Sequence, residues 1–280
     1  MTILVLGGTG KTGGVLTKLL HEAGLPFLVA SRSGKAPEPY KAVTFDWFDP
    51  STFENPFKAD SNIDKVYLVL PVAQYDTLPV VAPFIDLAIS KGVKRIVLLT
   101  ALQGEPGSPA FGVVQSYLEA KDIEYAVLRP SWFSQNFASL FIKSIRENDE
   151  VFSATGEGKI PWISSEDVAQ AAFDTLTTPE SIRKDLLVVG PELLTYDEAA
   201  SILSNVLGRT IKHKKHTPEE QMKAFSQVLT PEFSQVMVDM EVAVAQGLEE
   251  KYFKEPASRL YVGKHRLEDY FKANRDIWTK

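Results

Sequence analysis

Short apolar runs alternate with helical patterns through the first half of the chain. Residues 3–6 are wholly apolar, which suits a strand buried on both faces of a parallel sheet. The alternation predicts an α/β fold, a Rossmann-type doubly wound parallel sheet whose ligand crevice lies at the carboxyl edge. The expected strands are 3–6, 27–30, 43–45, 66–70, 95–100 and 125–128, with the clearest helices at 78–90 and 111–121.

The pattern changes in the second half. Glu166 and Asp167 open a helix, and acids in a first turn are commonly capping residues, so we assign Asp167 a structural role. Thr195 and Glu198 have the spacing of a capping box. From His213 onward helix formers dominate, which predicts a small, mostly helical lid over the substrate.

A glycine-rich turn joins the first strand to the first helix. Gly7, Gly10 and Gly13 lie there, with Lys11 and Thr12 between them. Glycine can adopt positive φ and leaves no Cβ against a diphosphate, while a helix N-terminus offers unpaired N–H groups. This context predicts a dinucleotide site. The alternative is a tight turn without a ligand.

The end of the second expected strand indicates which dinucleotide binds. An NAD site usually has an acid about twenty residues beyond the glycines, but Ser31, Arg32 and Ser33 stand here. A guanidinium and two hydroxyls suit a 2′-phosphate, which Lys11 could also reach. We therefore expect NADP(H) rather than NAD(H), unless Arg32 is only a solvated loop charge. The expected domains are an NADP(H)-binding domain over 1–150, sheet elements returning at 151–190, and a mostly helical substrate-binding portion over 191–280.

The composition of the chain limits the kinds of ligand that we expect it to bind. The net charge of −6 argues against a nucleic-acid ligand and would tolerate a cationic small molecule. The chain has no cysteine, which excludes disulfides and thiolate metal sites. The His213–His216 cluster lacks a nearby carboxylate ligand, so we expect a solvated surface there and no metal. With no long apolar run and no signal peptide, we expect a cytoplasmic protein without membrane contact.

Several longer motifs resemble those of the NmrA-like, atypical short-chain dehydrogenases. They are the glycine turn, L-R-P-S-W-F-S-Q-N at 128–136, S-A-T-G-E-G-K-I-P-W-I-S at 153–164 and G-P-E-L-L-T-Y-D-E at 190–198. Within that group the chain is most similar to the festuclavine and agroclavine dehydrogenases of ergot-alkaloid pathways, for example at F-D-W, 45–47, and L-G-R-T-I-K-H, 207–213. The resemblance implies NADPH binding and hydride transfer to an iminium carbon of an indole alkaloid.

The resemblance also completes the expected cofactor site. Thr100 ends a strand where short-chain dehydrogenases hold a catalytic Ser or Thr, and Asp46 and Trp47 lie where an adenine edge would be. Pro71 begins a loop expected beside the nicotinamide ribose, and Lys159 either contacts the cofactor or shapes its loop. The expected cofactor-binding residues are Gly7, Gly10, Lys11, Thr12, Gly13, Ser31, Arg32, Ser33, Asp46, Trp47, Pro71, Thr100 and Lys159.

The proton donor of ordinary short-chain dehydrogenases has no clear counterpart. Tyr117 and Lys121 have the Tyr-x-x-x-Lys spacing, but a strand begins only four residues later. The family's lysine would fall near Val113, so we interpret the spacing as coincidence. Hydride converts an iminium into a neutral amine and needs no proton donor, whereas a ketone would need one.

Aromatic and amide side chains are the substrate-binding candidates. Tyr75, Trp132 and Phe133 could face a cation, with Trp132 nearest the chemistry, or they could pack in the core. Gln135 and Asn136 could hold the nicotinamide amide or the substrate.

Two other functions remain open on this scaffold. A redox-neutral cyclase of the Pictet–Spengler type would keep NADP(H) as a structural element and use Tyr117, Asp76 or a lid glutamate as its base. A non-catalytic NADP-sensing regulator would need a partner surface on the helical portion. We favour the reductase, and the sequence does not specify an oligomeric state.

Overall fold

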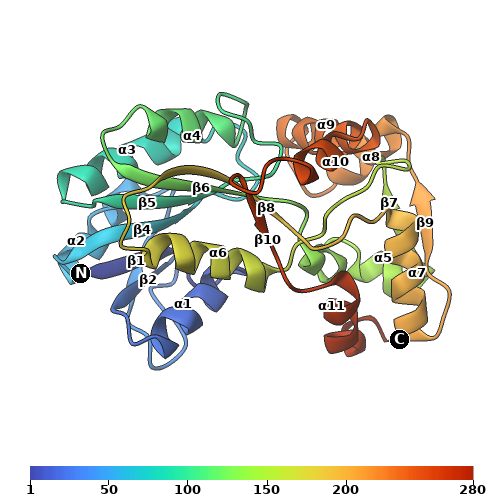
Figure 1. Cartoon of the computed structure of the whole chain (residues 1–280), viewed down its shortest axis with the longest axis horizontal. Helices are drawn as coiled ribbons and strands as arrows, with labels where there is room; N and C mark the ends of the chain where they lie inside the picture. Colours follow the sequence, from blue (N-terminus) through green and yellow to red (C-terminus); the bar gives the residue numbers. More distant parts are fainter. Residues whose placement is uncertain (280) are drawn as a thin grey trace. The chain divides into compact units, whose positions relative to one another are not determined.

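Eight parallel strands form the main sheet of the computed structural model, which describes residues 1–279 (Figure 1). Their order is β10-β8-β6-β5-β4-β1-β2-β3, so the direction of winding changes at β1. The predicted doubly wound sheet is thereby confirmed. The strands are β1 (Thr2–Leu6), β2 (Phe27–Ser31), β3 (Ala42–Thr44), β4 (Ile63–Val69), β5 (Arg95–Leu99), β6 (Glu124–Pro130), β8 (Arg183–Val189) and β10 (Leu260–Val262).

The chain forms two compact units. The first contains residues 1–129 and 168–186, and the second contains 130–167 and the described residues from 187 onward. Neither unit is one continuous stretch, because the chain passes between them three times.

Helices cover both faces of the sheet in the first unit. Figure 1 shows α3 and α4 on one face, with α1 and α6 on the other. The helices of this unit are α1 (Gly13–Glu22), α2 (Asn55–Ala59), α3 (Leu78–Ser90), α4 (Gly112–Glu119) and most of α6 (Ser165–Thr177), together with the 3-10 turn η1 (Pro50–Thr52).

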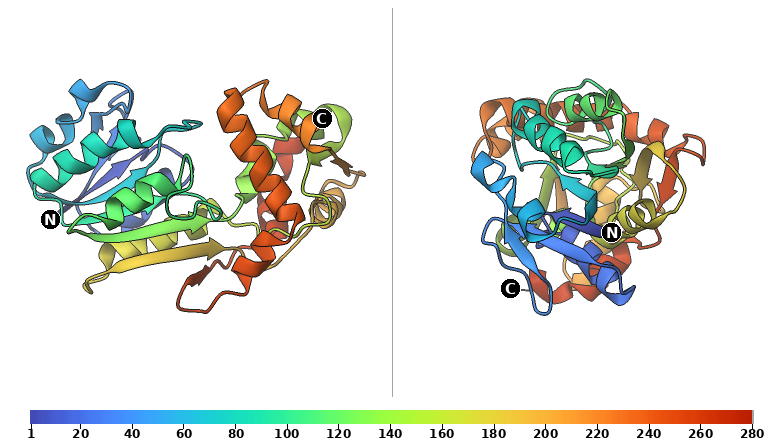
Figure 2. Two further views of the ribbon diagram at one scale, coloured as in Figure 1. Left: turned by 90° about the horizontal axis from the view of Figure 1, so that it is seen from above. Right: turned by 90° about the vertical axis from the view of Figure 1, so that its left-hand side faces the viewer.

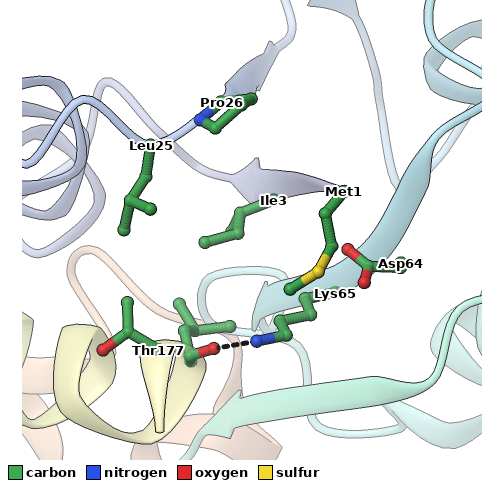
Figure 3. Close-up of a pocket in the computed structure, with 8 residues that line it drawn as sticks. Met1, Ile3, Leu25, Pro26, Asp64, Lys65 and Thr177 are labelled. Atoms are coloured by element: carbon green, nitrogen blue, oxygen red, sulfur yellow. Dashed lines mark hydrogen bonds between the residues drawn. The ribbon is translucent and has the colours of Figure 1, made fainter. Parts of the chain in front are cut away.

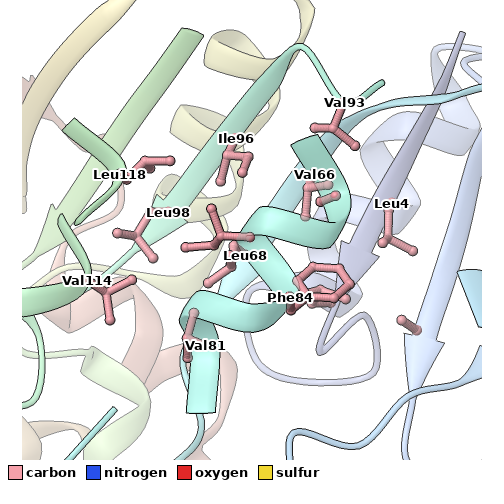
Figure 4. Close-up of a cluster of buried hydrophobic side chains, with 14 of the residues drawn as sticks. Leu4, Val66, Leu68, Val81, Phe84, Val93, Ile96, Leu98, Val114 and Leu118 are labelled. Atoms are coloured by element: carbon pink, nitrogen blue, oxygen red, sulfur yellow. The ribbon is translucent and has the colours of Figure 1, made fainter. Parts of the chain in front are cut away.

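Aliphatic side chains fill the space between α3, α4 and the strands (Figure 4). Phe84 and Val81 of α3 and Leu118 of α4 are fully buried against β-strand residues such as Leu68 and Leu98. Burying a side chain of this size contributes about 1.5–3 kcal/mol. Because helices cover both faces of the sheet, strands such as β1 have buried side chains on both sides.

The amino edge of the same sheet is held by basic side chains. Buried Arg95 pairs with Glu124 at 2.6 Å and donates to three carbonyl oxygens around the end of α6. Beside it, Lys65 Nζ donates to Leu176 O, over a small apolar hollow lined by Met1, Ile3 and Leu25 (Figure 3). Desolvation and the charge of Arg95 lower the pKa of Lys65.

The second unit is mainly helical, and it includes the helical C-terminal portion that was predicted from residue 191 onward. Its long helix α9 is drawn in orange in Figure 2. The helices are α5 (Ile142–Asn148), α7 (Tyr196–Leu207), α8 (Pro218–Phe225), α9 (Pro231–Ala245), α10 (Leu248–Phe253) and α11 (Leu267–Ala273), with 3-10 turns η2 (Ser134–Ala138) and η3 (Arg275–Trp278). Thr195 and Glu198 form the predicted capping box at the start of α7.

A short parallel ribbon in this unit was not predicted. β7 (Glu150–Ser153) pairs with β9 (Lys212–Lys215), whose K-H-K-K sequence is too polar to indicate a strand. Its His213 side chain is nevertheless buried and stacks on Tyr196, with ring centroids 5.2 Å apart. Aromatic packing around Trp162 and Tyr196 forms the core of the unit.

Candidate functional site

The turn after β1 is built so that only glycine fits. Gly7 has φ +63°, and its carbonyl accepts from Gly10 N at 2.8 Å. A Cβ on Gly13 would lie 2.3 Å from Gly7 O, and one on Gly8 would lie 2.9 Å from the Val29 side chain. The start of α1 therefore packs directly on the end of β1. Gly8 is an additional requirement that the spacing of the other glycines did not indicate.

A buried tyrosine supports this turn from β4. Tyr67 donates its hydroxyl hydrogen to Thr12 Oγ1 at 2.9 Å, and burial strongly raises the pKa of Tyr67. Thr12 is itself 5% exposed. Lys11, between the glycines, is exposed to solvent, yet the protein atoms around it partly desolvate the ammonium and lower its pKa. The turn thus combines a buried Tyr67–Thr12 hydrogen bond with the exposed ammonium of Lys11.

In the loop after β2, the serines and the arginine have different surroundings. Ser31 Oγ donates to Lys35 O at 2.8 Å, and both Ser31 and Ser33 accept from Lys35 N. These hydroxyls fold the loop back on itself. The Arg32 side chain is exposed, and its guanidinium has no ion pair or hydrogen bond within residues 1–279. Arg32 is therefore available to bind an anion.

The turn after β3 is stabilised by its own side chains. Asp46 Oδ1 accepts from Phe48 N at 3.0 Å, and Trp47 Nε1 donates to Val69 O at 3.1 Å. The Trp47 ring packs edge-on against Phe45, with centroids 4.9 Å apart. Trp47 is thus partly a core residue, whereas Phe48 beside it is 64% exposed.

The loop after β4 exposes apolar and acidic groups. Pro71 is buried, and Ala73 has φ +57°. Tyr75 and Asp76 are exposed, and neither side chain is packed into the core of the first unit. This loop follows a strand adjacent to β1, so it lies at the same carboxyl edge as the glycine turn.

Thr100 and Tyr117 both have structural partners. Thr100 N donates to Leu128 O at 2.9 Å, and its hydroxyl lies 3.4 Å from the same oxygen. Tyr117 donates its hydroxyl hydrogen to Asp86 Oδ2 at 2.7 Å, and Lys121 Nζ lies 2.7 Å from Asp86 Oδ1. The hydrogen bond from Lys121, then that from Tyr117, lowers the pKa of Asp86.

The position of Tyr117 separates it from the carboxyl edge. α4 runs from the carboxyl end of β5 to the amino end of β6, and Tyr117 is in its last turn. The Tyr-x-x-x-Lys spacing therefore places both side chains toward the amino edge, where they hold α4 against α3.

Apart from Tyr75, which belongs to the first unit, the candidate substrate residues lie in the second unit. Trp132 is 7% exposed, and its indole N–H has no hydrogen-bond partner among residues 1–279. Phe133 forms an isolated parallel bridge with Ile163 and is half-buried. Gln135 accepts from Ser165 N at 3.1 Å and donates to Glu166 Oε2 at 3.1 Å, so its amide is held at the start of α6.

Asn136 and Lys159 are less constrained. Both are half-buried, and no hydrogen bond or ion pair engages the Asn136 amide or the Lys159 ammonium in the described part of the chain. Gly158, just before Lys159, packs against the α9 backbone, since its Cβ would lie 2.1 Å from Val244 O. The loop that carries Lys159 is thereby fixed to α9.

Asp167 lies in the first turn of α6, and both of its carboxylate oxygens contact His265. It is 5% exposed, and its Oδ2 accepts from His265 N at 3.0 Å. Its Oδ1 lies 2.9 Å from His265 Nδ1. Glu166 is the next residue to Asp167. Burial raises the pKa of Glu166, but hydrogen bonds from Ser164 and Ser165 and the charge of His265 together have the larger effect, so the pKa of Glu166 is lowered. No sequence pattern links residues 98 positions apart.

Two buried acids lie deeper in the second unit. Glu249 accepts from Ser131 Oγ at 2.8 Å. Glu241 is 1% exposed and accepts from Ala154 N at 2.7 Å and from Gln221 Nε2 at 3.1 Å. Burial raises the pKa of Glu241 to about 8. Within residues 1–279 no three side chains gather as a candidate metal site.

Comparison with known proteins identifies the family. The model of the NmrA-like family matches residues 1–271. The chain belongs to the NmrA-like family. The resemblance drawn from its motifs is therefore confirmed. None of its described helices has the length and apolar character needed to span a membrane.

Curated relatives of this NmrA-like protein include agroclavine and festuclavine dehydrogenases. It is 40% identical over 285 residues to agroclavine dehydrogenase of Claviceps fusiformis, covering 99% of each chain. It is 41% identical to festuclavine dehydrogenase of Aspergillus fumigatus, covering 89% of each. The structure of Citrobacter sp. triphenylmethane reductase complexed with NADP(H) has the same fold, with TM-score 0.71, 21% identity and coverage of 92% of this chain and 93% of that one.

Proposed function

We propose that this NmrA-like protein is an NADPH-dependent reductase that transfers hydride to the iminium carbon of an indole-alkaloid intermediate. The observation that carries the proposal is the 40% identity to agroclavine dehydrogenase over 99% of both chains. Because the similarity covers 99% of both chains, it extends to both units and includes the glycine turn and the helical portion.

The first unit supports NADPH as the cofactor. A glycine turn that leads directly into the N-terminus of α1 is the kind of arrangement that binds the diphosphate of a dinucleotide. Arg32 is exposed at the end of the neighbouring strand and has no competing partner in the described residues. A guanidinium can bind a 2′-phosphate with two parallel hydrogen bonds. NADPH supplies the hydride, and the chain binds and orients it.

The hydrogen bond of Tyr117 shows that this chain does not use the tyrosine donor of ordinary short-chain dehydrogenases in its usual role, which fits an iminium acceptor. The Tyr117 hydroxyl is used by Asp86 on the outer side of α3 and α4. Reduction of a ketone would need a proton as the alkoxide forms, but reduction of an iminium neutralises a cation and needs none. The aromatic residues Trp132 and Phe133 can stabilise that cation through their ring faces.

One experiment separates the reductase from the alternatives. NADPH absorbance and product mass are followed together with indole amines, aldehydes and the iminium salts they form. We expect one NADPH oxidised per reduced product. A cyclised product without NADPH oxidation would favour the redox-neutral cyclase, with exposed Asp76 as the first base to replace. NADP(H) binding without any turnover would favour the sensing regulator.

A further inference from the structure

His265 and Asp167 form an oriented pair in the second unit. The Asp167 side chain is 6% exposed, while that of His265 is 54% exposed. Asp167 Oδ1 lies 2.9 Å from His265 Nδ1, so the ring donates its Nδ1 hydrogen to the carboxylate. This bond leaves His265 Nε2 as the nitrogen that exchanges protons. His265 Nε2 has no hydrogen-bond partner among the described residues.

The backbone at Gly263 and His265 brings the imidazole beside Asp167. Gly263 N donates to Val189 O at 2.7 Å, which continues the pairing of β10 with β8. A Cβ on Gly263 would lie 2.5 Å from Asp167 Oδ2, so glycine allows the chain to pass close to the carboxylate. The His265 N–H also donates to Asp167. Because any residue other than proline keeps that backbone bond, the imidazole is not needed to anchor the loop.

The pair adjoins the candidate substrate residues. Ile163 N donates to Trp132 O at 3.0 Å, and Glu166, next to Asp167, accepts from Gln135. The charge of His265 also acts on Glu166. The segments after β6 and β10 therefore meet at the start of α6, and they bring an exposed imidazole into the same cluster as the Gln135 amide.

Iminium ions present a chemical difficulty that this imidazole can solve. In water an iminium ion adds water to give the carbinolamine, which hydride cannot reduce. Loss of its hydroxyl requires a proton on the leaving oxygen, and a positioned histidine is well suited to supply it at neutral pH. An iminium reductase with such a donor could accept the hydrated form directly.

We propose that His265, positioned by Asp167, is the general acid that dehydrates the carbinolamine to the iminium before hydride transfer. The His265 imidazolium gives its Nε2 proton to the hydroxyl oxygen as the C–O bond breaks. The amine lone pair forms the C=N⁺ bond, water leaves, and the neutral imidazole recovers a proton from solvent. The substrate class is an indole amine joined to an aldehyde. This role rests on the proposed iminium reductase activity.

The test compares two substrates with the full-length protein and NADPH. One is an indole amine tethered to an aldehyde, and the other is an N-methyl iminium salt conjugated to an indole, which resists hydration. We expect His265→Gln to lower kcat/KM for the amino aldehyde about 100-fold, the lower range for general acid catalysis, and for the iminium salt less than about threefold. His21→Gln, on the exposed C-terminal turn of α1, is the matched control and changes neither value.

The outcomes separate the two proposals. Equal effects of His265→Gln on both substrates, whether large or absent, would overturn the dehydration role. If the wild-type protein failed to oxidise NADPH with the iminium salt, the proposed function would fail and the role of His265 with it. Thermal unfolding of the variant accompanies the kinetics, and an unchanged Tm shows that the retained backbone bond still holds the loop.

Discussion

Gly13 determines how closely the first helix approaches the first strand. A methyl group there would lie 2.3 Å from Gly7 O and 2.8 Å from Gly8 Cα, and both are backbone atoms that cannot move aside cheaply. Overpacking of this kind costs about 1–3 kcal/mol. We expect Gly13→Ala to lower the free energy of unfolding in urea by at least that amount, without cofactor present.

The neighbouring glycine provides the control. A Cβ on Gly14 would be 3.9 Å from its nearest neighbour, an ordinary contact, within the same helix. Gly14→Ala should therefore leave stability unchanged or raise it by up to about 1 kcal/mol through helix propensity. Equal losses in the two variants would show that close packing at Gly13 is not what the turn requires.

Arg32 is the residue on which the choice of cofactor depends. Because the serines beside it bond within their own loop, its guanidinium is the group of this loop expected to bind a 2′-phosphate. We expect Arg32→Ala to weaken NADPH binding by about 1.5–3 kcal/mol and to leave NADH binding unchanged. Calorimetric titration of both cofactors measures this, with Lys18→Ala on α1 as the control. Equal losses for NADPH and NADH would contradict the prediction.

Single residues were the least predictable part of the site from sequence. The glycine turn could be predicted because its spacing follows a strand and precedes a helix. The internal bonds of Ser31 and the anchoring of Trp47 to Val69 could not, because each depends on how a loop folds back. The assigned cofactor and substrate roles stay predictions.

Among the elements, α9 is tied to the rest of its unit by a buried acid. Glu241 accepts from Ala154 N, after β7, and from Gln221 of α8. Tyr196 of α7 is a titratable group that is affected by Glu241. Burial and the charge of Glu241 raise the pKa of Tyr196. No cation pairs with Glu241 within residues 1–279, so burial dominates its titration.

The raised pKa makes the anchoring of α9 depend on pH. The Glu241 carboxyl titrates near 4.5 in the unfolded chain and at about 8 in the folded one, so the folded state binds more protons between these values. Its contribution to stability is therefore lost as pH rises through this window. We expect Glu241→Gln to be more stable than wild type by an amount that grows by about 1–4 kcal/mol from pH 5 to pH 8.

Urea unfolding at several pH values tests this expectation. Glu232→Gln, in the first turn of α9, is the control because that residue is exposed. A stability difference between Glu241→Gln and wild type that stays constant over the window would mean that Glu241 titrates normally.

Elements were predictable where apolar periodicity was strong. The strands of the first unit are buried on both faces, so their apolar runs mark them. β9 was missed because its lysines are solvated and only His213 turns inward. Pairing between positions such as Glu150 and Lys212, 62 residues apart, leaves no trace in a local pattern.

At the scale of the whole molecule, the alternation of strands and helices sufficed to predict the Rossmann-type sheet, but not how the chain is shared between units. Residues 168–186 belong with the glycine turn, more than 150 positions away, while 130–167 belong with the helical portion. Such membership is set by long-range contacts, such as those of Arg95 around the end of α6, rather than by local sequence.

This division predicts which backbone amides a bound cofactor protects. Ligand at 100 times its Kd stabilises the state that binds it by about 2.7 kcal/mol, and amides that exchange only when that unit opens should slow accordingly. We expect saturating NADP⁺ to slow hydrogen exchange in α6 (Ser165–Thr177) as much as in α1, because most of α6 lies in the unit with the glycine turn. α5 (Ile142–Asn148) should slow less, although it is nearer to α1 in sequence. Protection of α5 equal to that of α1, with α6 unaffected, would instead favour a continuous cofactor domain over 1–150.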